Sequence, residues 1–431
     1  MNFVIVGSGP AGIFAVEAIR RRDKETPVTI VTADPNVAQS PVMLSYWMAG
    51  NASREVLLFR DRSWSERMMI HVKPGCRIAS LKRASRKLVL TDGQEIDYDR
   101  LLIAAGGTPI SLPIPGIKSK GVASLRTFSD AETILKGGVG GGGILIIGGG
   151  FIGLKLAYHL KERGLEVTIL ERELKLAVRM FDMKSSRIIE KKLRQEGIGV
   201  ETGVEVTEVL NERGWVTGVR MKDGRTLPCQ QIVQAVGMKP NAQWLTGSGI
   251  NLKGGVLVNQ QMETNLPRVY AAGDVAMTLD SISSEWVNNA TWPSATRQGT
   301  VAGTNMAGGS LTYIHNFAMN ALNLFGLQVM AAGHAFYDED NGVDILSEER
   351  GEVYRKIVIK EDRVIGFILI GDISGAGLLL SRMKREDEIP PGLREVLLSS
   401  GSFPRDLLPN LGFRHGLLFN SRAQPEGCGR E

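Results

Sequence analysis

Phe3-Val4-Ile5-Val6-Gly7-Ser8-Gly9-Pro10-Ala11-Gly12 is an apolar run that ends in a glycine-rich turn. An amphipathic stretch from Ile13 to about Arg22 follows, and a second apolar run extends from Val28 to Val31. This order of strand, turn, helix and strand, with a G-x-G-x-x-G turn, predicts a βαβ unit that binds a dinucleotide. One such glycine turn alone is weak support, because α/β domains that bind no nucleotide also contain glycine turns.

Each glycine of the turn has its own predicted role. Gly7 permits the tight bend, Gly9 lets the backbone approach a pyrophosphate, and Gly12 allows the helix to pack closely on the strand. The start of the following helix offers free N–H groups and the positive end of its dipole to the phosphates. Pro10 and Ala11 complete this predicted phosphate site.

The same arrangement returns in the middle of the chain. Ile144 to Ile147 lead into Gly148-Gly149-Gly150-Phe151-Ile152-Gly153, followed by a helical stretch to Arg163 and an apolar run from Val167 to Leu170. In both halves, the glycine of an Asp-Gly pair precedes a strand-end glycine by 13 positions. These glycines are Gly93 and Gly106 in the first half and Gly224 and Gly237 in the second. Two nucleotide-binding units of similar layout are therefore expected.

An acidic residue after the second strand of each unit is expected to hold ribose hydroxyls. In the first unit the candidate is Asp34, although Thr32 directly follows the strand and Asp34 also suits a plain turn. In the second unit Glu171 ends the strand, where a carboxylate favours the 2′-hydroxyl of NAD and repels the 2′-phosphate of NADP. Arg172 follows and weakens that exclusion, so NADH is preferred over NADPH; a solvated charge is the alternative for Glu171.

Composition limits the remaining possibilities. The 431 residues predict two or three domains, and a net charge of +5 is too mild to indicate nucleic acid or an anionic membrane surface. Three scattered cysteines without CxxC spacing, and five histidines outside any ligand pattern, argue against a disulfide framework or a metal site. With no leader segment and no long apolar run, the chain is expected to be cytoplasmic and without a membrane span.

A third landmark, TNLPRVYAAGDVA over residues 264–276, joins the two glycine turns. Together they resemble the FAD- and NAD(P)-dependent pyridine nucleotide-disulfide oxidoreductase superfamily over nearly the whole chain. In that family the acid at the position of Asp274 hydrogen-bonds the ribityl chain of the flavin. Residues 104–107 and 236–241 resemble the family's two strand-end motifs. Residues 292–299 are similar to its helix start beneath the flavin, although Trp292 also suits a packed core.

The resemblance implies an α/β fold with two Rossmann-like, three-layer ββα domains of the glutathione-reductase type and a C-terminal α+β interface domain. Residues 1–112 and 243–312 are assigned to the FAD-binding domain, 113–242 to the NAD(H)-binding domain, and 313–431 to the interface domain with an extended tail. The expected FAD site is Gly7, Gly9, Pro10, Ala11, Gly12, Asp34, Pro41, Ile78, Ala105, Gly106, Gly273, Asp274 and Ala295. The expected NAD(H) site is Gly148, Gly150, Phe151, Ile152, Gly153, Glu171 and Gly237.

Two positions depart from the family pattern. Residues 40–46, Ser-Pro-Val-Met-Leu-Ser-Tyr, are similar to Ser-Pro-Cys-x-Leu-Pro-Tyr of coenzyme A disulfide reductase and NADH oxidase relatives. Val42 replaces their redox-active cysteine and cannot form a thiolate or a sulfenic acid, so electrons are expected to leave the flavin directly. Lys155 stands where FIGLE is more common than FIGLK; it is a candidate positive charge near the flavin, or a solvated side chain.

Strands are expected at Arg355 to Lys360 and Val364 to Gly371, and a helix near Leu378 to Arg385. The two strands resemble the C-terminal domain of the nitrite-reductase-like and rubredoxin-reductase-like branch, which passes electrons to an iron–sulfur or other metal centre. The leading expectation is an FAD-dependent oxidoreductase that moves hydride between NADH and FAD and exchanges electrons with such a partner. It would act in a homodimer or hetero-complex, for example as the FAD subunit of a tungsten or molybdenum oxidoreductase. The alternatives are a non-catalytic NADH-sensing flavoprotein and an NADH oxidase that uses oxygen directly.

Overall fold

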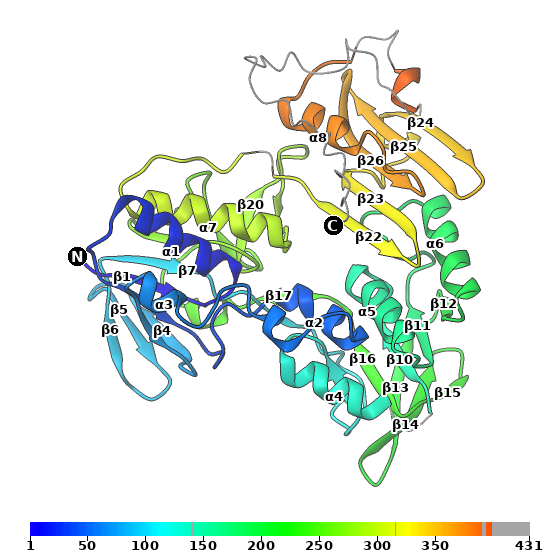
Figure 1. Ribbon diagram of the computed structural model, residues 1–431, viewed down its shortest axis with the longest axis horizontal. Coiled ribbons are helices and arrows are strands. Elements are labelled where there is room, and N and C mark those ends of the chain that lie inside the picture. Colours follow the sequence, from blue (N-terminus) through cyan, green and yellow to red (C-terminus); the bar gives the residue numbers. More distant parts are fainter. Residues whose placement is uncertain (139–141, 315, 390–393, 399–431) are drawn as a thin grey trace, which may run out of the picture.

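The computed structural model describes residues 1–138, 142–314, 316–389 and 394–398 (Figure 1). The extended tail expected at the end of the chain therefore lies largely outside the described residues. Within these ranges the chain builds three five-stranded sheets, two parallel and one antiparallel, and four smaller sheets. No helix in the same ranges is long and apolar enough to cross a membrane.

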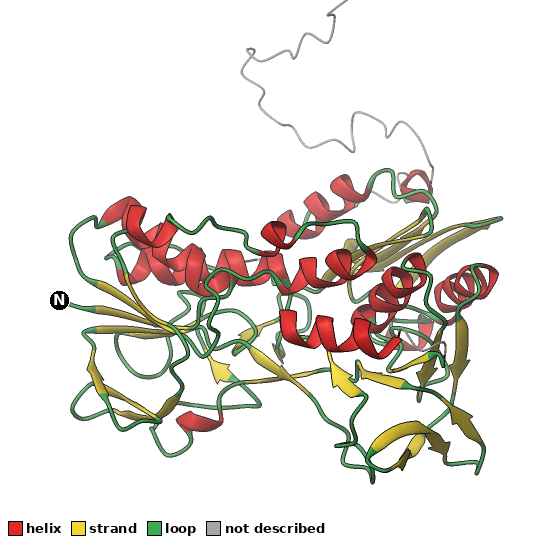
Figure 2. Ribbon diagram, turned by 60° about the horizontal axis from the view of Figure 1, so that its bottom comes forward, coloured by secondary structure: helices red, strands yellow, loops and turns green. Residues whose placement is uncertain are grey.

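The first parallel sheet has five strands in the order β19-β7-β1-β2-β3. Its strands are β1 (Phe3–Val6), β2 (Val28–Val31), β3 (His71–Lys73), β7 (Arg100–Ile103) and β19 (Val269–Ala271). Helices α1 (Pro10–Arg22) and α7 (Trp292–Met306) pack on it. The antiparallel strands β4 (Ile78–Lys82), β5 (Lys87–Leu90) and β6 (Glu95–Asp97) form another layer that shares its core (Figure 2). This is the expected ββα arrangement.

Helix α1 starts earlier than its amphipathic pattern predicts, at Pro10 rather than Ile13. Gly9 is the N-cap residue, and a proline suits the first turn because its missing N–H would have no partner there. The last turn carries Arg20, Arg21 and Arg22, which favour the negative end of the helix dipole. The bounds of β1 and β2 agree with the predicted apolar runs.

The second parallel sheet has the order β12-β11-β10-β16-β9. Its strands are β9 (Val122–Ser124), β10 (Ile144–Ile147), β11 (Val167–Glu171), β12 (Gly199–Thr202) and β16 (Gln231–Gln234). Side chains alternate between the two faces of β10. Ile144 and Ile146 pack with α5 (Phe151–Glu162), whereas Leu145 and Ile147 pack with the antiparallel strands β13 (Val206–Glu212) and β14 (Trp215–Met221). Helices α4 (Phe128–Gly138) and α6 (Met183–Gln195) and strand β15 (Thr226–Pro228) complete this region.

Short elements connect the two parallel sheets. Strands β8 (Gly107–Pro109) and β17 (Met238–Pro240) pair antiparallel, so the two strand-end motifs of the sequence meet each other. Helix α2 (Pro41–Ala49) packs on α5. The remaining elements here are α3 (Trp64–Arg67), β18 (Val256–Leu257), β20 (Ala276–Leu279) and β21 (Trp286–Val287).

The third sheet is wholly antiparallel, in the order β22-β23-β26-β25-β24. Its strands are β22 (Met319–Leu324), β23 (Leu327–Gly333), β24 (Asp344–Arg350), β25 (Val353–Lys360) and β26 (Arg363–Ile370). One face shares a core with α2 and α5, and the other packs against α8 (Ala376–Arg385). The predicted α/β fold, with two Rossmann-like units and a C-terminal domain, is confirmed. The residue boundaries of the domains stay predictions.

Candidate active site

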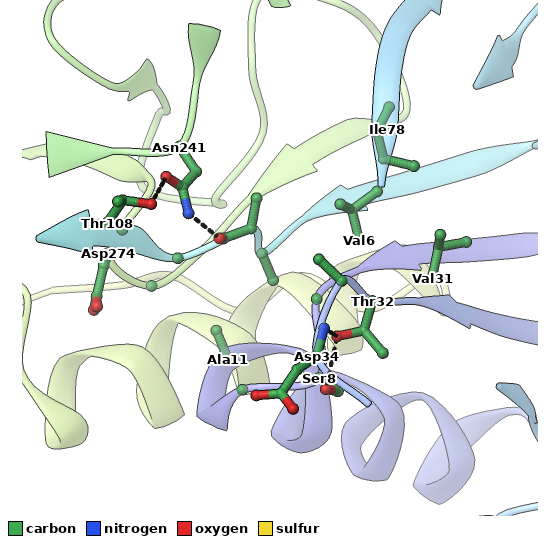
Figure 3. A pocket seen from close by; sticks show the side chains of 18 of the residues that line it. Val6, Ser8, Ala11, Val31, Thr32, Asp34, Ile78, Thr108, Asn241 and Asp274 are labelled. Atoms are coloured by element: carbon green, nitrogen blue, oxygen red, sulfur yellow. Dashed lines mark hydrogen bonds between the residues drawn. The ribbon is translucent and has the colours of Figure 1, made fainter. Parts of the chain in front are cut away.

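A cavity of about 580 Å³ lies at the carboxyl ends of the first parallel sheet (Figure 3). Open α/β sheets bind ligands at this edge, and the volume suits a large cofactor. Twelve of the residues predicted to hold FAD line the cavity. They are Gly7, Gly9, Pro10, Ala11, Asp34, Pro41, Ile78, Ala105, Gly106, Gly273, Asp274 and Ala295.

Gly12 is the predicted FAD residue that does not line the cavity, and it has a packing role instead. A Cβ atom on Gly12 would lie 2.1 Å from the carbonyl oxygen of Gly7. Gly7 itself has a φ of +107°, and a Cβ there would lie 2.1 Å from the carbonyl oxygen of Ala104. A Cβ on Gly9 would meet nothing within 4 Å. The turn is therefore tightly packed on the protein side and open on the cavity side, as a pyrophosphate requires.

The N-termini of α1 and α7 both face this cavity. The two helices approach at backbone distance, because Gly299 and Gly303 lie against Ala11 and Ala15. Thr291 caps α7, and its side chain accepts a hydrogen bond from the backbone N–H of Ser294. Two dipole ends thus converge on one site, which favours a ligand that carries negative charge.

Trp292 begins α7, as the resemblance implies. Its ring also packs edge-on against Phe59, with the ring centroids 4.8 Å apart. Trp292 is only half-buried, so it is not a fully packed core residue, and its place beneath the flavin stays a prediction. Further along α7, the Gln298 side-chain oxygen accepts a hydrogen bond from the Gly273 N–H at 2.8 Å, which holds the third sequence landmark against the helix.

Asp274 has a cation near it that the sequence did not reveal. Arg126 Nη1 lies 3.7 Å from Asp274 Oδ2, and both residues line the cavity. Burial raises the pKa of Asp274 and the charge of Arg126 partly opposes this effect. Arg126 follows β9, far from Asp274 along the chain, and no local motif marks it. Only the tertiary arrangement brings the two together.

Side chains in or next to strands β8 and β17 line another part of the cavity and are held by hydrogen bonds. Asn241 donates a hydrogen bond from Nδ2 to the Ala105 carbonyl oxygen at 2.9 Å and accepts one from Thr108 at 2.7 Å (Figure 3). Asn241 and Thr108 also line the cavity. The sequence grouped residues 236–241 with the strand-end motif but did not predict that Asn241 faces the FAD cavity.

Asp34 combines the two features that were expected as alternatives. Its carboxylate accepts a hydrogen bond from the Asn36 N–H at 2.8 Å, which is a local turn contact, and the residue also lines the cavity. Thr32 directly after β2 bonds to Ser8 in the glycine turn, with 3.0 Å between the hydroxyl oxygens. A ribose role for Asp34 remains a prediction.

The second glycine turn repeats the geometry of the first. Gly148 has a φ of +111°, and a Cβ there would lie 2.5 Å from the carbonyl oxygen of Ala235. A Cβ on Gly153 would lie 2.0 Å from the carbonyl oxygen of Gly148, whereas one on Gly150 would meet nothing within 4 Å. The internal repeat seen in the sequence is thus also a repeat of backbone packing, and the second turn equally leaves room for a phosphate.

Glu171 at the end of β11 turns its carboxylate to the second glycine turn. It accepts hydrogen bonds from the N–H groups of Gly149 at 2.6 Å and Glu173 at 2.8 Å. Arg172 bonds to Glu173 at 2.9 Å. The Arg172 guanidinium is therefore paired with a neighbouring carboxylate.

The other predicted NAD(H) residues lie at the same edge of the second sheet. Gly237 lies three residues after the end of β16 and has a φ of +114°. Phe151 packs on Phe181, with ring centroids 5.3 Å apart, and Ile152 is 48% exposed. All seven predicted residues are therefore grouped around the ends of β10, β11 and β16.

The two departures from the family pattern lie between these sites. Val42 belongs to α2, one residue after the cavity-lining Pro41, and is 42% exposed. Lys155 of α5 places Nζ 4.3 Å from the ring centroid of Tyr46 on α2. Position 42 therefore carries no redox thiol, and position 155 carries no glutamate.

The cysteines have separate environments. Cys229 is buried, and burial raises the pKa of its thiol to about 12. Cys76 lines the first cavity, and Cys428 lies outside the described residues. In the described part of the chain, no group of three or more His, Cys, Asp and Glu side chains is placed to hold a metal ion.

Comparisons with known proteins identify the family that the chain resembles. Residues 1–299 match the family model of the pyridine nucleotide-disulphide oxidoreductases, and residues 319–387 match that of the rubredoxin NAD⁺ reductase C-terminal domain. The chain is 30% identical over 393 residues to the NADH-dependent phenylglyoxylate dehydrogenase subunit epsilon of Aromatoleum evansii, covering 90% of this chain and 93% of that protein. It is 30% identical over 304 residues to putidaredoxin reductase of Pseudomonas putida, covering 69% and 72%.

Among solved structures, the reductase in the covalent putidaredoxin reductase–putidaredoxin complex has the same fold. The TM-score is 0.84 at 24% identity, and the match covers 91% of this chain and 95% of that chain. The resemblance inferred from the motifs, including the rubredoxin-reductase-like branch, is confirmed. The chain therefore belongs to the pyridine nucleotide-disulphide oxidoreductase family and is an FAD-dependent NAD(P)H oxidoreductase.

Proposed function

We propose that the chain transfers electrons between NADH and an iron–sulfur or other metal-centre protein, as the FAD-containing subunit of a larger oxidoreductase. The observation that carries this proposal is Val42, which stands next to the FAD cavity where thiol-dependent relatives have their redox cysteine. Valine offers no sulfur to carry electrons onward, so they must pass directly between the flavin and the partner.

The first cavity is proposed to hold FAD. The open side of Gly9, between the N-termini of α1 and α7, suits the pyrophosphate. Asp274 suits a neutral hydroxyl of the ribityl chain, because its partly buried carboxylate is a strong hydrogen-bond acceptor. Asp34 is proposed to bind the ribose. When bound, FAD supplies the redox chemistry, since it takes up an electron pair and can release electrons singly.

The second glycine turn is proposed to hold NADH rather than NADPH. Glu171 already faces the turn, and its carboxylate would repel a 2′-phosphate. Arg172, which was expected to weaken this preference, is paired with Glu173 and 72% exposed. The relative from Aromatoleum evansii is named as NADH-dependent, which supports the same choice.

The subunit role is supported by that relative too, because it is a subunit of a dehydrogenase and the chain covers nearly all of it. The putidaredoxin reductase comparison supports an iron–sulfur partner. A tungsten or molybdenum enzyme as the metal-centre partner is named by neither relative and stays a prediction, as do the direction of electron transfer, the oligomeric state and the cytoplasmic location.

The test is an affinity purification of the tagged full-length chain from its native host under anaerobic conditions. We expect stoichiometric FAD, bleaching of the flavin by NADH, and a co-purifying protein with an iron–sulfur absorption and electron paramagnetic resonance spectrum. A chain that purifies from the native host without any metal-centre protein would contradict the subunit role. Lack of FAD, or lack of bleaching by NADH, would contradict the whole proposal.

The same preparation separates the two alternative functions. An NADH oxidase would consume oxygen at the rate at which it consumes NADH, without a partner. A non-catalytic NADH sensor would reduce artificial acceptors no faster than free reduced flavin reacts with air. The proposed function instead predicts fast turnover with ferricyanide or a ferredoxin and slow turnover with oxygen.

A further inference from the structure

Lys155 and Tyr46 form a cation–π contact between helices α5 and α2. The Lys155 Nζ lies 4.3 Å from the centroid of the Tyr46 ring, and the other neighbour of that ring is the His159 imidazole, 4.5 Å away between centroids. Leu44 and Leu156 belong to the apolar core that joins the same two helices. The contact is therefore held by a packed helix pair.

This contact lies between the two nucleotide sites. Helix α5 starts at the second glycine turn, with Gly150 as its N-cap residue, and Lys155 is on its second turn. Helix α2 starts at Pro41, which lines the first cavity, and Tyr46 is on its second turn. Hydride transfer requires reacting atoms about 3 to 3.5 Å apart, so the nicotinamide and the flavin must meet between these helix starts.

The Lys155 ammonium has no ion-pair partner among the described residues. No carboxylate oxygen in these ranges lies within 4.0 Å of Nζ. Burial lowers the pKa of Lys155 to about 8, so the amine is mostly protonated at neutral pH. Burial, followed by the charge of Lys155, lowers the pKa of His159 to about 4, so this imidazole is neutral.

The other ionisable groups on the elements packed against Lys155 are few. Strands β10 and β22 contribute none. The carboxylate of Glu162 is bonded to Tyr158 at 2.6 Å and to Asn51 at 3.1 Å, and that of Glu171 is bonded to the second glycine turn. Lys155 is the cation that contacts the Tyr46 ring where α5 packs on α2.

On the basis of the proposed function, we propose that the Lys155 ammonium at this junction favours the binding of NADH over NAD⁺ and favours the reduced, electron-rich flavin over the oxidised flavin. Electrons would then enter the chain from NADH. In this transfer NADH loses a hydride, which carries two electrons and one proton, and becomes NAD⁺ with a cationic nicotinamide ring. A fixed positive charge nearby repels that cationic ring and stabilises the negative charge gained by the flavin. Stabilisation of the reduced flavin favours electron entry from NADH, and repulsion of the cationic ring weakens NAD⁺ binding and so favours release of NAD⁺ after the transfer.

The test uses FAD-loaded protein and two readouts that do not depend on turnover. The first is the ratio of the dissociation constants of NAD⁺ and of 1,4,5,6-tetrahydro-NADH, a redox-inert analogue whose reduced nicotinamide ring is uncharged, measured by calorimetry on the oxidised protein. The second is the flavin midpoint potential from an anaerobic dye-coupled titration. Lys155→Met removes the charge, Lys155→Arg retains it, Lys155→Glu reverses it, and Lys161→Met on the same helix is the control.

We expect Lys155→Met to lower the NAD⁺-to-analogue ratio about tenfold, because one unit charge at short range in a partly buried site has an effect of this size. The midpoint potential should fall by an amount that corresponds to a tenfold change in the reduced-to-oxidised ratio, about 30 mV for a two-electron couple. Lys155→Glu should exceed both changes, and Lys155→Arg and Lys161→Met should resemble the wild type.

The pH dependence of the NAD⁺-to-analogue ratio gives a further check, because a purely structural role of Lys155 would not make this ratio change with pH. In the wild type the NAD⁺-to-analogue ratio should fall above about pH 8, where Lys155 loses its proton, and in Lys155→Arg it should not. If Lys155→Met matches Lys161→Met in both readouts while FAD is bound and NADH bleaches it, the inference fails and the proposed function stands. If the wild-type protein binds no FAD, both fail.

Discussion

Gly299 of α7 lies directly against the backbone of Ala11 of α1. A Cβ atom at position 299 would lie 2.1 Å from the Ala11 carbonyl oxygen, and one at Gly303 would lie 2.2 Å from that of Ala15. The spacing of four residues puts both glycines on the same face of α7. Because both helices begin at the FAD cavity, this contact sets the separation of the two helix N-termini that face the ligand.

Gly299→Ala should therefore impair both stability and cofactor retention. The added methyl group meets backbone rather than a mobile side chain, so the helices must separate, at a cost of about 1 to 3 kcal/mol. Urea unfolding and the FAD-to-protein ratio after gel filtration measure the two effects. The control is Gly377→Ala in α8, where a Cβ meets nothing within 4 Å and stability should be unchanged or higher. Wild-type stability and FAD content in Gly299→Ala would contradict this account.

Asp274→Asn should weaken FAD binding without lowering the stability of the FAD-free protein. Burial raises the pKa of this carboxyl above its value in the unfolded chain. In FAD-free protein the ionised carboxylate therefore destabilises the fold, and this destabilisation disappears as the group is protonated when the pH falls toward 4. The FAD-free variant should consequently melt at or above the wild-type temperature at pH 7. Its FAD affinity should fall about tenfold or more, because a charge-assisted hydrogen bond is lost.

Differential scanning fluorimetry of the FAD-free proteins and an FAD titration measure these two effects. Asp340→Asn, on an exposed turn of the C-terminal domain, is the control and should change neither. A variant that binds FAD as tightly as the wild type would argue against contact between Asp274 and the cofactor.

Much of the two parallel sheets could be predicted because their signals are local. β1, β2 and β10 are short apolar runs beside glycine turns, and their observed bounds match the predicted ones. Strands β22 and β23 were not predicted. Met319–Leu324 contains two asparagines among its apolar residues without a strict alternation, and its role becomes evident only when it pairs with Leu327–Gly333.

The candidate site likewise contains residues that the sequence could predict and residues that it could not. The glycines of both turns were predictable, because a specific backbone conformation leaves few other residue choices. The cavity is also lined by three residues that lie in or just after the short strands β8, β9 and β17, namely Thr108, Arg126 and Asn241. No short sequence pattern predicts that residues so far apart in the chain line the same cavity. Lys155 was noticed because it departs from a family pattern, but its contact with Tyr46 required the packing of α2 on α5.

Glu171→Gln should change nucleotide preference without opening the second glycine turn. The amide oxygen can still accept the hydrogen bond from the Gly149 N–H, but the negative charge that repels a 2′-phosphate is gone. The ratio of kcat/KM for NADPH to that for NADH should rise about tenfold. Steady-state kinetics with ferricyanide measure it, and Glu208→Gln, which removes a partly exposed carboxylate of β13 paired with Arg220, should leave the ratio within about twofold of the wild type. An unchanged ratio in Glu171→Gln would remove Glu171 from the ribose site.

Asp182 joins the NAD(H) region to the C-terminal sheet, and its replacement should destabilise that junction. As the N-cap residue of α6 it accepts hydrogen bonds from the Ser185 N–H at 2.9 Å and from the Tyr354 hydroxyl at 2.6 Å, and Lys356 Nζ lies 3.3 Å away. Burial alone would raise the pKa of Asp182, but these hydrogen bonds and the Lys356 charge outweigh it and lower the pKa below the usual value.

Because the folded-state pKa is lowered, the ionised carboxylate contributes stability that is present above about pH 4 and is lost as the pH falls further. Asp182→Asn leaves the buried Lys356 ammonium without its counter-charge, which typically costs about 3 to 5 kcal/mol. At pH 7 the variant should therefore unfold at a clearly lower urea concentration than the wild type. The difference should shrink as the pH falls to 3.

Tyr354→Phe tests the same junction more mildly. It removes one buried hydrogen bond to the carboxylate but keeps the charges, so a loss of about 1 to 3 kcal/mol is expected. The matched control is Asp223→Asn, an exposed carboxylate that bonds only within its own turn and to Arg225. Equal pH dependence of stability in Asp182→Asn and Asp223→Asn would show that Asp182 does not couple the C-terminal sheet to α6.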